Sequence, residues 1–108
     1  MVVRFGTVAL PAVRAASMRM RVASHNIANL TTVGFFPHGT ISEATPDGGV
    51  EVKEVSPRDP RYPRPSYTHR DVAGEIVTLM QAKHAYSASL AVIKTEDQTV
   101  GALIDVLA

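Results

Sequence analysis

Apolar residues in the first third of the chain recur at alternating spacings of three and four residues. The row comprises Val13, Ala16, Met20, Ala23, Ile27 and Leu30. This spacing is typical of a helix that contacts another helix along one narrow face, and the alanines would allow a close approach. Pro11 suits the first turn of such a helix, where an N–H group is not needed. The pattern predicts an N-terminal helix over residues 8–31.

A longer row of the same kind runs through the last third of the chain. It comprises Val72, Ile76, Leu79, Tyr86, Leu90, Ile93, Val100, Ile104 and Leu107. Only Lys83 and Asp97 interrupt the spacing, and no proline occurs within it. Thr68 or Asp71 is expected to cap the start of the helix. The pattern predicts a C-terminal helix over residues 70–107, which would be roughly 55 Å long.

The segment between the two predicted helices has a different pattern. Residues 46–49 form a turn signal, and residues 50–55 alternate apolar and polar side chains as a half-buried strand does. Residues 40–44 are expected to pair with this strand. Four prolines within residues 57–65 exclude a helix and favour an extended chain. We therefore expect a β-hairpin and an extended, proline-rich stretch over residues 36–68.

These elements predict one mainly α domain over residues 1–108. Long N- and C-terminal helices would form an antiparallel coiled-coil-like pair, joined by the short β and extended, proline-rich insert. The C-terminal helix would extend about 25 Å beyond its partner. Its apolar row would leave a larger patch than a solitary soluble monomer normally exposes, so we expect other subunits to complete the core. The alternative is a compact monomer whose insert covers the rest of the row.

Charge separates the two ends of a chain whose formal net charge is only +1. Residues 1–42 hold four arginines and no acid, whereas residues 71–108 hold five acids and two lysines. The ends are therefore electrostatically complementary, and the charges give orientation more than affinity. The residues expected to meet between subunits are Arg14, Arg19 and Arg21 on one side and Glu96 and Asp97 on the other.

The sequence contains no signature of catalysis or metal binding. It has no cysteine, its histidines lack metal-ligand spacing, and no phosphate loop, dinucleotide fingerprint or nucleophile elbow occurs. We therefore expect no enzyme, no cofactor and no metal. No apolar run is long enough to span a bilayer, and Pro11 and Arg14 interrupt the apolar start of the chain. That interruption argues against a cleaved signal peptide.

Arginines alternate with tyrosines ahead of the predicted C-terminal helix. They are Arg58, Arg61, Arg64 and Arg70, with Tyr62 and Tyr67 among them. Such a strip is compatible with nucleic-acid binding. The neutral net charge of residues 43–70 favours a solvated linker instead, so we expect no nucleic acid and no membrane insertion.

The end of the predicted first helix carries an unusual polar stretch. Residues 24–29 read SHNIAN and are followed by Thr32, Gly34 and Phe35. This stretch resembles the N-terminal signature of the bacterial flagellar basal-body rod and hook family. The C-terminal helix resembles the other end of the same family. The residues that carry this second likeness are Glu75, Ile76, Leu79, Met80, Ala82, Tyr86, Ala88, residues 92–95 and the closing residues 101–105. His69, His84 and Ser89 depart from the residues that the family often has there.

The resemblance implies a structural subunit of the flagellar basal-body rod, with no catalysis. Its terminal helices would pack together and against other rod and basal-body proteins, and against further copies, to build the axial tube. The flagellar type III export apparatus would deliver the chain to the periplasm-spanning rod without a cleaved signal. The short insert resembles that of the FlgC-type proximal rod subunit. The alternative is a small coiled-coil adaptor or flagellar export chaperone that binds a partner helix.

The resemblance and the apolar rows nominate two sets of residues for assembly. Motif and interface residues are Asn26, Ile27, Ala28, Asn29, Thr32, Gly34, Phe35, Glu75, Leu79, Tyr86, Ala88, Lys94 and Thr95. Helix contact residues are Val13, Met20, Ala23, Leu30, Ile76, Leu90, Ile93, Val100 and Ile104. The partners of the two motif amides are expected on another chain.

Overall fold

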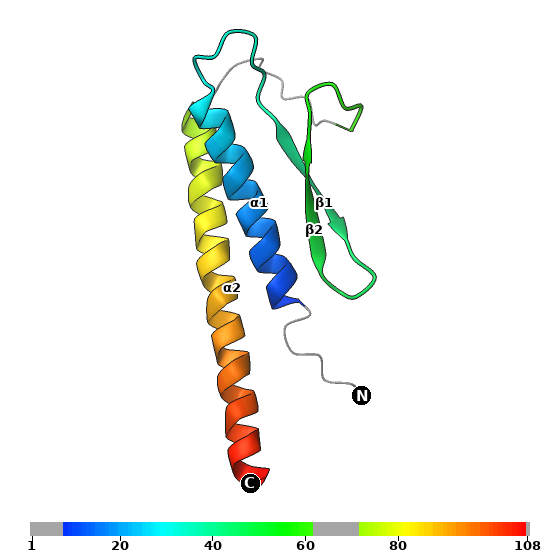
Figure 1. Ribbon diagram of the computed structural model, residues 1–108, viewed down its shortest axis with the longest axis vertical. Helices are drawn as coiled ribbons and strands as arrows, with labels where there is room; N and C mark the ends of the chain where they lie inside the picture. The colour runs from blue at the N-terminus through cyan, green and yellow to red at the C-terminus, as the bar shows by residue number, and fades with distance from the viewer. Residues whose placement is uncertain (1–7, 62–71, 108) are drawn as a thin grey trace.

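The structure, a computed structural model, describes residues 8–61 and 72–107. It contains helix α1 (Ala9–Ala28), strands β1 (Gly39–Ala44) and β2 (Val50–Val55), and helix α2 (Val72–Leu107). The two helices lie side by side and run in opposite directions, and the hairpin packs on another side of α1 (Figure 1). The prediction of a mainly helical fold with a short antiparallel hairpin between the helices is confirmed.

Helix α1 is buried on two sides, because α2 covers one and β2 covers the other. Its buried residues are Ala9, Ala15, Ala16, Val22, Ala23 and Asn26. Ala9, Ala16 and Ala23 repeat every seven residues, and Ala15 and Val22 form a second row about 100° away. The sequence pattern showed the first row and missed the second. Because alanine dominates both, the neighbouring elements approach closely and the core is thin.

The hairpin turn rests on the first turn of α1. Gly48 takes a φ of +91°, which a glycine adopts without strain. The N–H of Thr45 donates to the carbonyl of Gly49 at 2.8 Å, and the N–H of Gly49 donates to Thr45 Oγ1 at 3.0 Å. A Cβ at Gly49 would lie 3.0 Å from two side-chain carbons of Pro11. Glycine therefore permits the close approach of the turn to the helix.

The strands pair antiparallel from Gly39 opposite Val55 to Ala44 opposite Val50. Val52 and Val55 are buried, whereas Val50 is 42% exposed. This burial departs from strict alternation. Two-stranded ribbons twist strongly, so the side of β2 that faces α1 changes along the strand.

A turn follows β2 where the proline-rich stretch begins. The N–H of Asp59 donates to the carbonyl of Ser56 at 2.9 Å, and the N–H of Arg61 donates to Asp59 Oδ1 at 2.8 Å. The predicted extended conformation of residues 62–65, like the predicted helix caps Thr68 and Asp71, lies outside the described residues. The proline-rich insert as a whole stays a prediction.

The side of α2 that faces α1 agrees only in part with the predicted row. At two places the partly buried residue is the one just before the predicted residue. The partly or fully buried residues spaced along this face are Glu75, Leu79, Ala82, Tyr86, Ser89, Ile93, Glu96 and Val100. Four of them belong to the predicted row, but Ile76 and Leu90 are 43% and 44% exposed. Ala82 is only 3% exposed, because a small residue suits the closest approach to the alanines of α1. The predicted row therefore faces α1 only in part, and Ile76 and Leu90 lie on an open side of α2.

Helix α2 has 36 residues and α1 has 20, so α2 is longer by about 24 Å. Figure 1 shows that this excess projects beyond the start of α1. Residues 101–107 are all exposed. The longer C-terminal helix is thus seen in the structure, with its last two turns carrying uncovered apolar side chains.

Candidate functional site

Asn26, at the centre of the SHNIAN stretch, joins three elements of the fold. Its side chain is only 3% exposed. Its Nδ2 donates to the carbonyl of His38 at 2.9 Å and to Glu75 Oε1 at 3.1 Å. Its Oδ1 accepts from the N–H of His38 at 2.9 Å. The expectation that the partners of this amide lie on another chain is wrong, since they lie before β1 and in α2.

Asn29 and Thr32 end α1 and turn the chain. Asn29 is the C-cap residue, and its backbone N–H and side-chain Nδ2 both donate to the carbonyl of His25, at 3.1 and 2.9 Å. Thr32 Oγ1 donates to Asn29 Oδ1 at 3.2 Å. Gly34 then takes a φ of +77°. These contacts satisfy carbonyl groups that the end of a helix leaves without partners, so these motif residues also act within the chain.

A cluster of aromatic and charged side chains lies around His38, the residue that Asn26 binds. The rings of His25, Phe35 and His38 lie 5.5 to 5.9 Å apart, with Phe35 stacked on His38. His38 Nδ1 lies 2.8 Å from Glu54 Oε1, in an electrostatic contact that lacks the alignment of a hydrogen bond. Arg21 Nη2 donates to the other oxygen of Glu54 at 3.3 Å. The cluster attaches β2 to the second half of α1.

The ion pairs along the hairpin and in the turn that follows it lie on the protein surface. Lys53 Nζ lies 3.0 Å from Glu43 Oε2, which lowers the pKa of Glu43 and raises the pKa of Lys53. The guanidinium of Arg61 lies 3.0 Å from Asp59 and lowers the pKa of that carboxyl. Exposed pairs of this kind contribute little stability. Arg61 of the arginine–tyrosine strip is thus paired with acids, while Tyr62, Arg64, Tyr67 and Arg70 lie outside the described residues.

The remaining nominated residues fall into two groups. Partly or fully buried are Val13, Met20, Ala23, Ile27, Leu30, Phe35, Leu79, Tyr86, Ile93 and Val100. Exposed are Ala28, Thr32, Gly34, Ile76, Ala88, Leu90, Lys94, Thr95 and Ile104. The first group includes residues that hold the fold together, and the second is accessible to another molecule.

One flank of α2 and its C-terminal end expose apolar side chains. The large exposed ones on this helix are Val72, Ile76, Val77, Met80, Leu90, Val92, Leu103, Ile104, Val106 and Leu107. Ile76, Leu90 and Ile104 are separated by 14 residues each, or four turns, and so lie along one side. The exposed residues Lys83 and Asp97 lie between them on the same side, so these apolar side chains form an interrupted row, which we call the exposed stripe.

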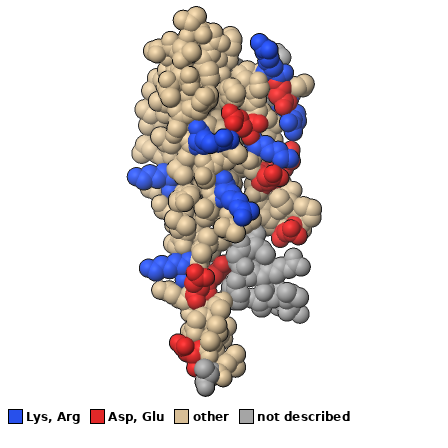
Figure 2. Space-filling model, viewed as in Figure 1, with Lys and Arg blue, Asp and Glu red and all other residues tan. Residues whose placement is uncertain are grey.

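The loop that follows α1, at the end of the molecule opposite the free end of α2, carries no charged side chain. Residues 22–42 contain no lysine, arginine, aspartate or glutamate. Figure 2 shows charged side chains over the hairpin and the neighbouring helix surface and further ones along the long helix towards its free end, with a broad uncharged region at the upper left of the view. Val33 and Phe36 at this end are 97% and 64% exposed. Two large apolar side chains are therefore exposed in this loop.

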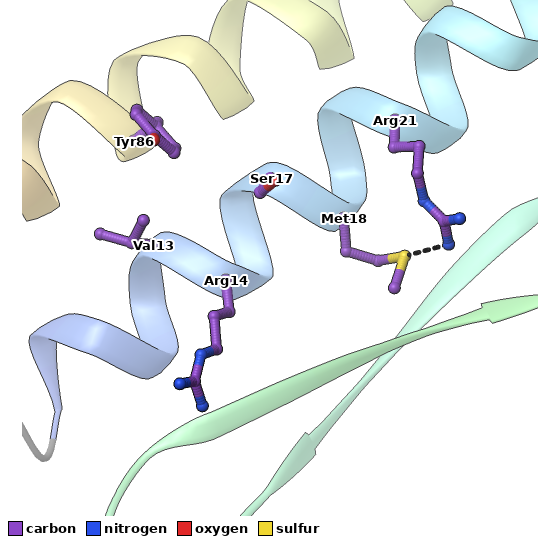
Figure 3. A pocket seen from close by; sticks show the side chains of 6 residues that line it. All are labelled: Val13, Arg14, Ser17, Met18, Arg21 and Tyr86. Carbon is purple, nitrogen blue, oxygen red and sulfur yellow. Dashed lines mark hydrogen bonds between the residues drawn. The ribbon is translucent and has the colours of Figure 1, made fainter.

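A shallow groove of about 270 Å³ opens along α1 beside α2. Its lining residues are Val13, Arg14, Ser17, Met18, Arg21 and Tyr86. Figure 3 shows Tyr86 on α2 facing the groove, while Arg14, Met18 and Arg21 project from the opposite side of the α1 ribbon. Arg21 Nη2 lies 3.0 Å from Met18 Sδ. The groove was not predicted from the sequence. Arg14 and Arg21 are seven residues apart, however, and this spacing places both on one side of a helix.

The predicted contacts of the three arginines with the acidic end are not found within this chain. Arg19 Nη2 donates to Ser42 Oγ at 3.0 Å, and Arg21 pairs with Glu54. Across residues 8–61 and 72–107, Arg14 makes no ion pair. Arg14 is exposed, and its guanidinium projects from α1 on the side away from Tyr86 (Figure 3).

Residues 71–106 match the model of a family described as "Flagellar basal body rod FlgEFG protein C-terminal". The C-terminal helix is similar to that of flagellar rod proteins. The match covers nearly all of α2, including Glu75, which contacts Asn26, and the exposed residues Ile76, Leu90 and Ile104. It supports the predicted relation to the rod and hook family, and it suggests a structural role in the flagellar basal body together with other rod proteins. The comparison with curated proteins gave no match.

In the described residues, no three histidine, aspartate or glutamate side chains are placed to hold a metal ion. No helix of the described part is long and apolar enough to cross a membrane.

Proposed function

We propose that this chain is a structural subunit of the bacterial flagellar basal-body rod and that it assembles through its terminal helices into the axial tube. The observation that carries the proposal is that the helix matching the rod family also exposes an apolar stripe. In a protein that stays a monomer, the solvent side of such a helix would carry mainly polar residues. The proposal assigns the stripe to contacts with neighbouring subunits.

The energetics favour burial of this stripe in an assembly. Each large aliphatic side chain that passes from water into an interface contributes up to about 1.5–3 kcal/mol. Ile76, Leu90, Leu103 and Ile104 are between 43% and 59% exposed, so each has part of this energy still to gain. Several such contacts repeated along a tube would hold subunits together without a large interface at any one point. An axial tube requires head-to-tail contacts with open helical symmetry, in which two different surfaces meet.

The subtype and the route to the rod are inferred from the chain's organisation. A short hairpin is the whole described middle region between α1 and the start of α2, which supports a FlgC-type proximal rod subunit over members with large middle domains. Delivery by the flagellar type III export apparatus, without a cleaved signal, belongs to the same proposal. So does a location in the periplasm-spanning rod with self and other basal-body proteins as partners. Ala28, Ala88, Lys94 and Thr95 are proposed as accessible contact residues.

The charge variant Leu90→Asp tests the assignment of the exposed stripe. A carboxylate at this position would have to be buried in the assembled rod, which is costly without a partner. We expect at least a tenfold fall in the amount of the chain recovered in purified basal bodies of a deletion strain carrying the variant. The measurement is quantitative mass spectrometry of those particles.

The matched control for this variant is Gln81→Asp. Gln81 is also exposed and lies nine residues from Leu90, on the opposite side of α2. This control should enter basal bodies as the wild type does. If Leu90→Asp were recovered as well as the control, the stripe would not be an assembly surface.

A further inference from the structure

The groove between Arg14 and Arg21 has the chemistry of a site for an acidic, partly apolar helix. Arg14 has no ion pair in the described part of the chain, and the side chain of Arg21 is 64% exposed although it contacts Glu54. Each guanidinium has five N–H donors in a fork that matches a carboxylate. Met18 lies between them and Tyr86 forms the wall. The groove thus presents two positive groups separated by an apolar, adaptable side chain.

The free end of α2 has the complementary pattern. After Lys94 the chain contains three acids and no base, so this end carries a charge of −3. Asp97, Gly101 and Asp105 follow one another at intervals of four residues along one side of the helix, and all three are exposed. A Cβ at Gly101 would have no atom within 4 Å, so this position is open to another chain.

The two patterns also match in length. Asp97 and Asp105 are separated by a rise of about 12 Å, and Arg14 and Arg21 by a rise of about 10.5 Å. If the aspartates are placed beside the arginines, Gly101 lies opposite Met18. Ile104 lies next to Asp105 and is 59% exposed, so it can enter the groove. The groove volume of about 270 Å³ exceeds the roughly 150 Å³ of an apolar cavity that holds benzene.

The chain cannot place its own acidic end in its own groove. Tyr86 already lies beside the groove, and Asp97 lies a further 11 residues along α2, about 16 Å away in the direction of the free end. The contact therefore requires a second molecule. Because the groove and the acidic end are different surfaces, such a contact repeats head to tail and does not close into a dimer.

We propose that the Arg14–Arg21 groove binds the acidic C-terminal end of α2, from Asp97 to Asp105, of a second copy of this chain. This inference rests on the proposed rod function, because it names the partner segment for one of the assembly contacts. It assigns specificity to the two arginine–aspartate pairs and leaves most of the affinity to the apolar stripe.

Disulfide trapping tests this contact directly, because the chain has no cysteine of its own. Purified Met18→Cys and Gly101→Cys chains are mixed under mild oxidation, and the mixed disulfide is quantified. We expect the Met18→Cys chain to couple to Gly101→Cys at least tenfold faster than to the control Gln81→Cys. Equal rates for the two partners would overturn the proposal.

Charge reversal in the same assay separates a specific contact from random collision. Arg14→Glu should reduce the coupling at least tenfold, since this arginine has no ion pair in the described part of the chain to lose. Introducing Asp97→Arg or Asp105→Arg in the Gly101→Cys chain should restore it, and the one that does so shows which aspartate meets Arg14. Failure of both to restore the coupling would overturn the proposed pairing.

The same cysteine variant distinguishes this inference from the proposed function. In purified basal bodies, Met18→Cys should form a disulfide with a Gly101→Cys copy of this chain. A crosslink to a different rod protein would reject the second copy as the occupant and leave the rod function intact. Absence of the chain from basal bodies would instead reject the proposed function.

Discussion

Single side chains decide how the elements of this chain are joined. Asn26 contacts a residue 12 positions away and another 49 positions away, and its three hydrogen bonds are made in a nearly dry site. Periodicity located this asparagine at the edge of an apolar row, but it gave no information about partners so distant in sequence. A polar residue in such a place costs stability if any partner is lost.

The substitution Asn26→Asp should destabilise the fold while changing almost no volume. The new carboxylate would replace Nδ2 next to Glu75 Oε1, which now lies 3.1 Å away, and next to the carbonyl of His38. We expect the free energy of unfolding to fall by about 1–3 kcal/mol at pH 7. The measurement is urea denaturation followed by circular dichroism, provided that the isolated chain unfolds cooperatively.

The pH dependence of this variant has a defined sign. Burial and the neighbouring carboxylate of Glu75 raise the pKa of the new carboxyl group above that of an exposed aspartate. As the pH falls below 7 this group becomes protonated and can donate a hydrogen bond, so the difference from the wild type should shrink. Ser24→Ala, at an exposed position of the same helix, should change the stability by less than about 0.5 kcal/mol over the same pH range. A constant difference between Asn26→Asp and the wild type across this range would contradict the role given to Glu75.

Elements were predicted well where a local pattern specifies them. The two helices and the hairpin follow from apolar spacing, and the turn follows from residues 46–49, whose glycine at position 48 takes positive φ. The rotation of α2 could not be obtained in this way. Ile76 belongs to the predicted row and Ala82 lies beside it, and only the alanine-rich surface of α1 determines that the smaller residue turns inward. The second buried row of α1 likewise depends on the hairpin that packs against it.

The contact between Lys53 and Glu43 across the hairpin can be tested by titrating Glu43. The ammonium of Lys53 donates to Glu43 and lowers the pKa of Glu43 below its usual value of 4.5. A lowered folded-state pKa means that the contribution to stability is present above pH 4.5 and is lost as the pH falls through the folded-state pKa. An NMR titration should show that Lys53→Met raises the pKa of Glu43 towards its usual value. An unchanged pKa would show that the two side chains do not meet in solution.

At the scale of the whole molecule, the fold is extended, and the surfaces that we propose for assembly lie in three places. These are the exposed stripe of α2, the free end of the same helix, and the groove on α1. The unequal lengths of the two helices and the separation of charge between the ends were visible in the sequence. The groove was not, because it forms only when Tyr86 of α2 is placed beside α1. All three surfaces fit an account in which the chain completes its structure within an assembly.

The position of this chain in the flagellar basal body tests that account most directly. Electron cryomicroscopy of basal bodies purified from the bacterium that encodes it should show the paired α1 and α2 within the wall of the rod, with the free end of α2 against a neighbouring copy. Deletion of the gene should remove that density and interrupt the rod. Complete rods that lack this chain, or density for it outside the rod, would contradict the account.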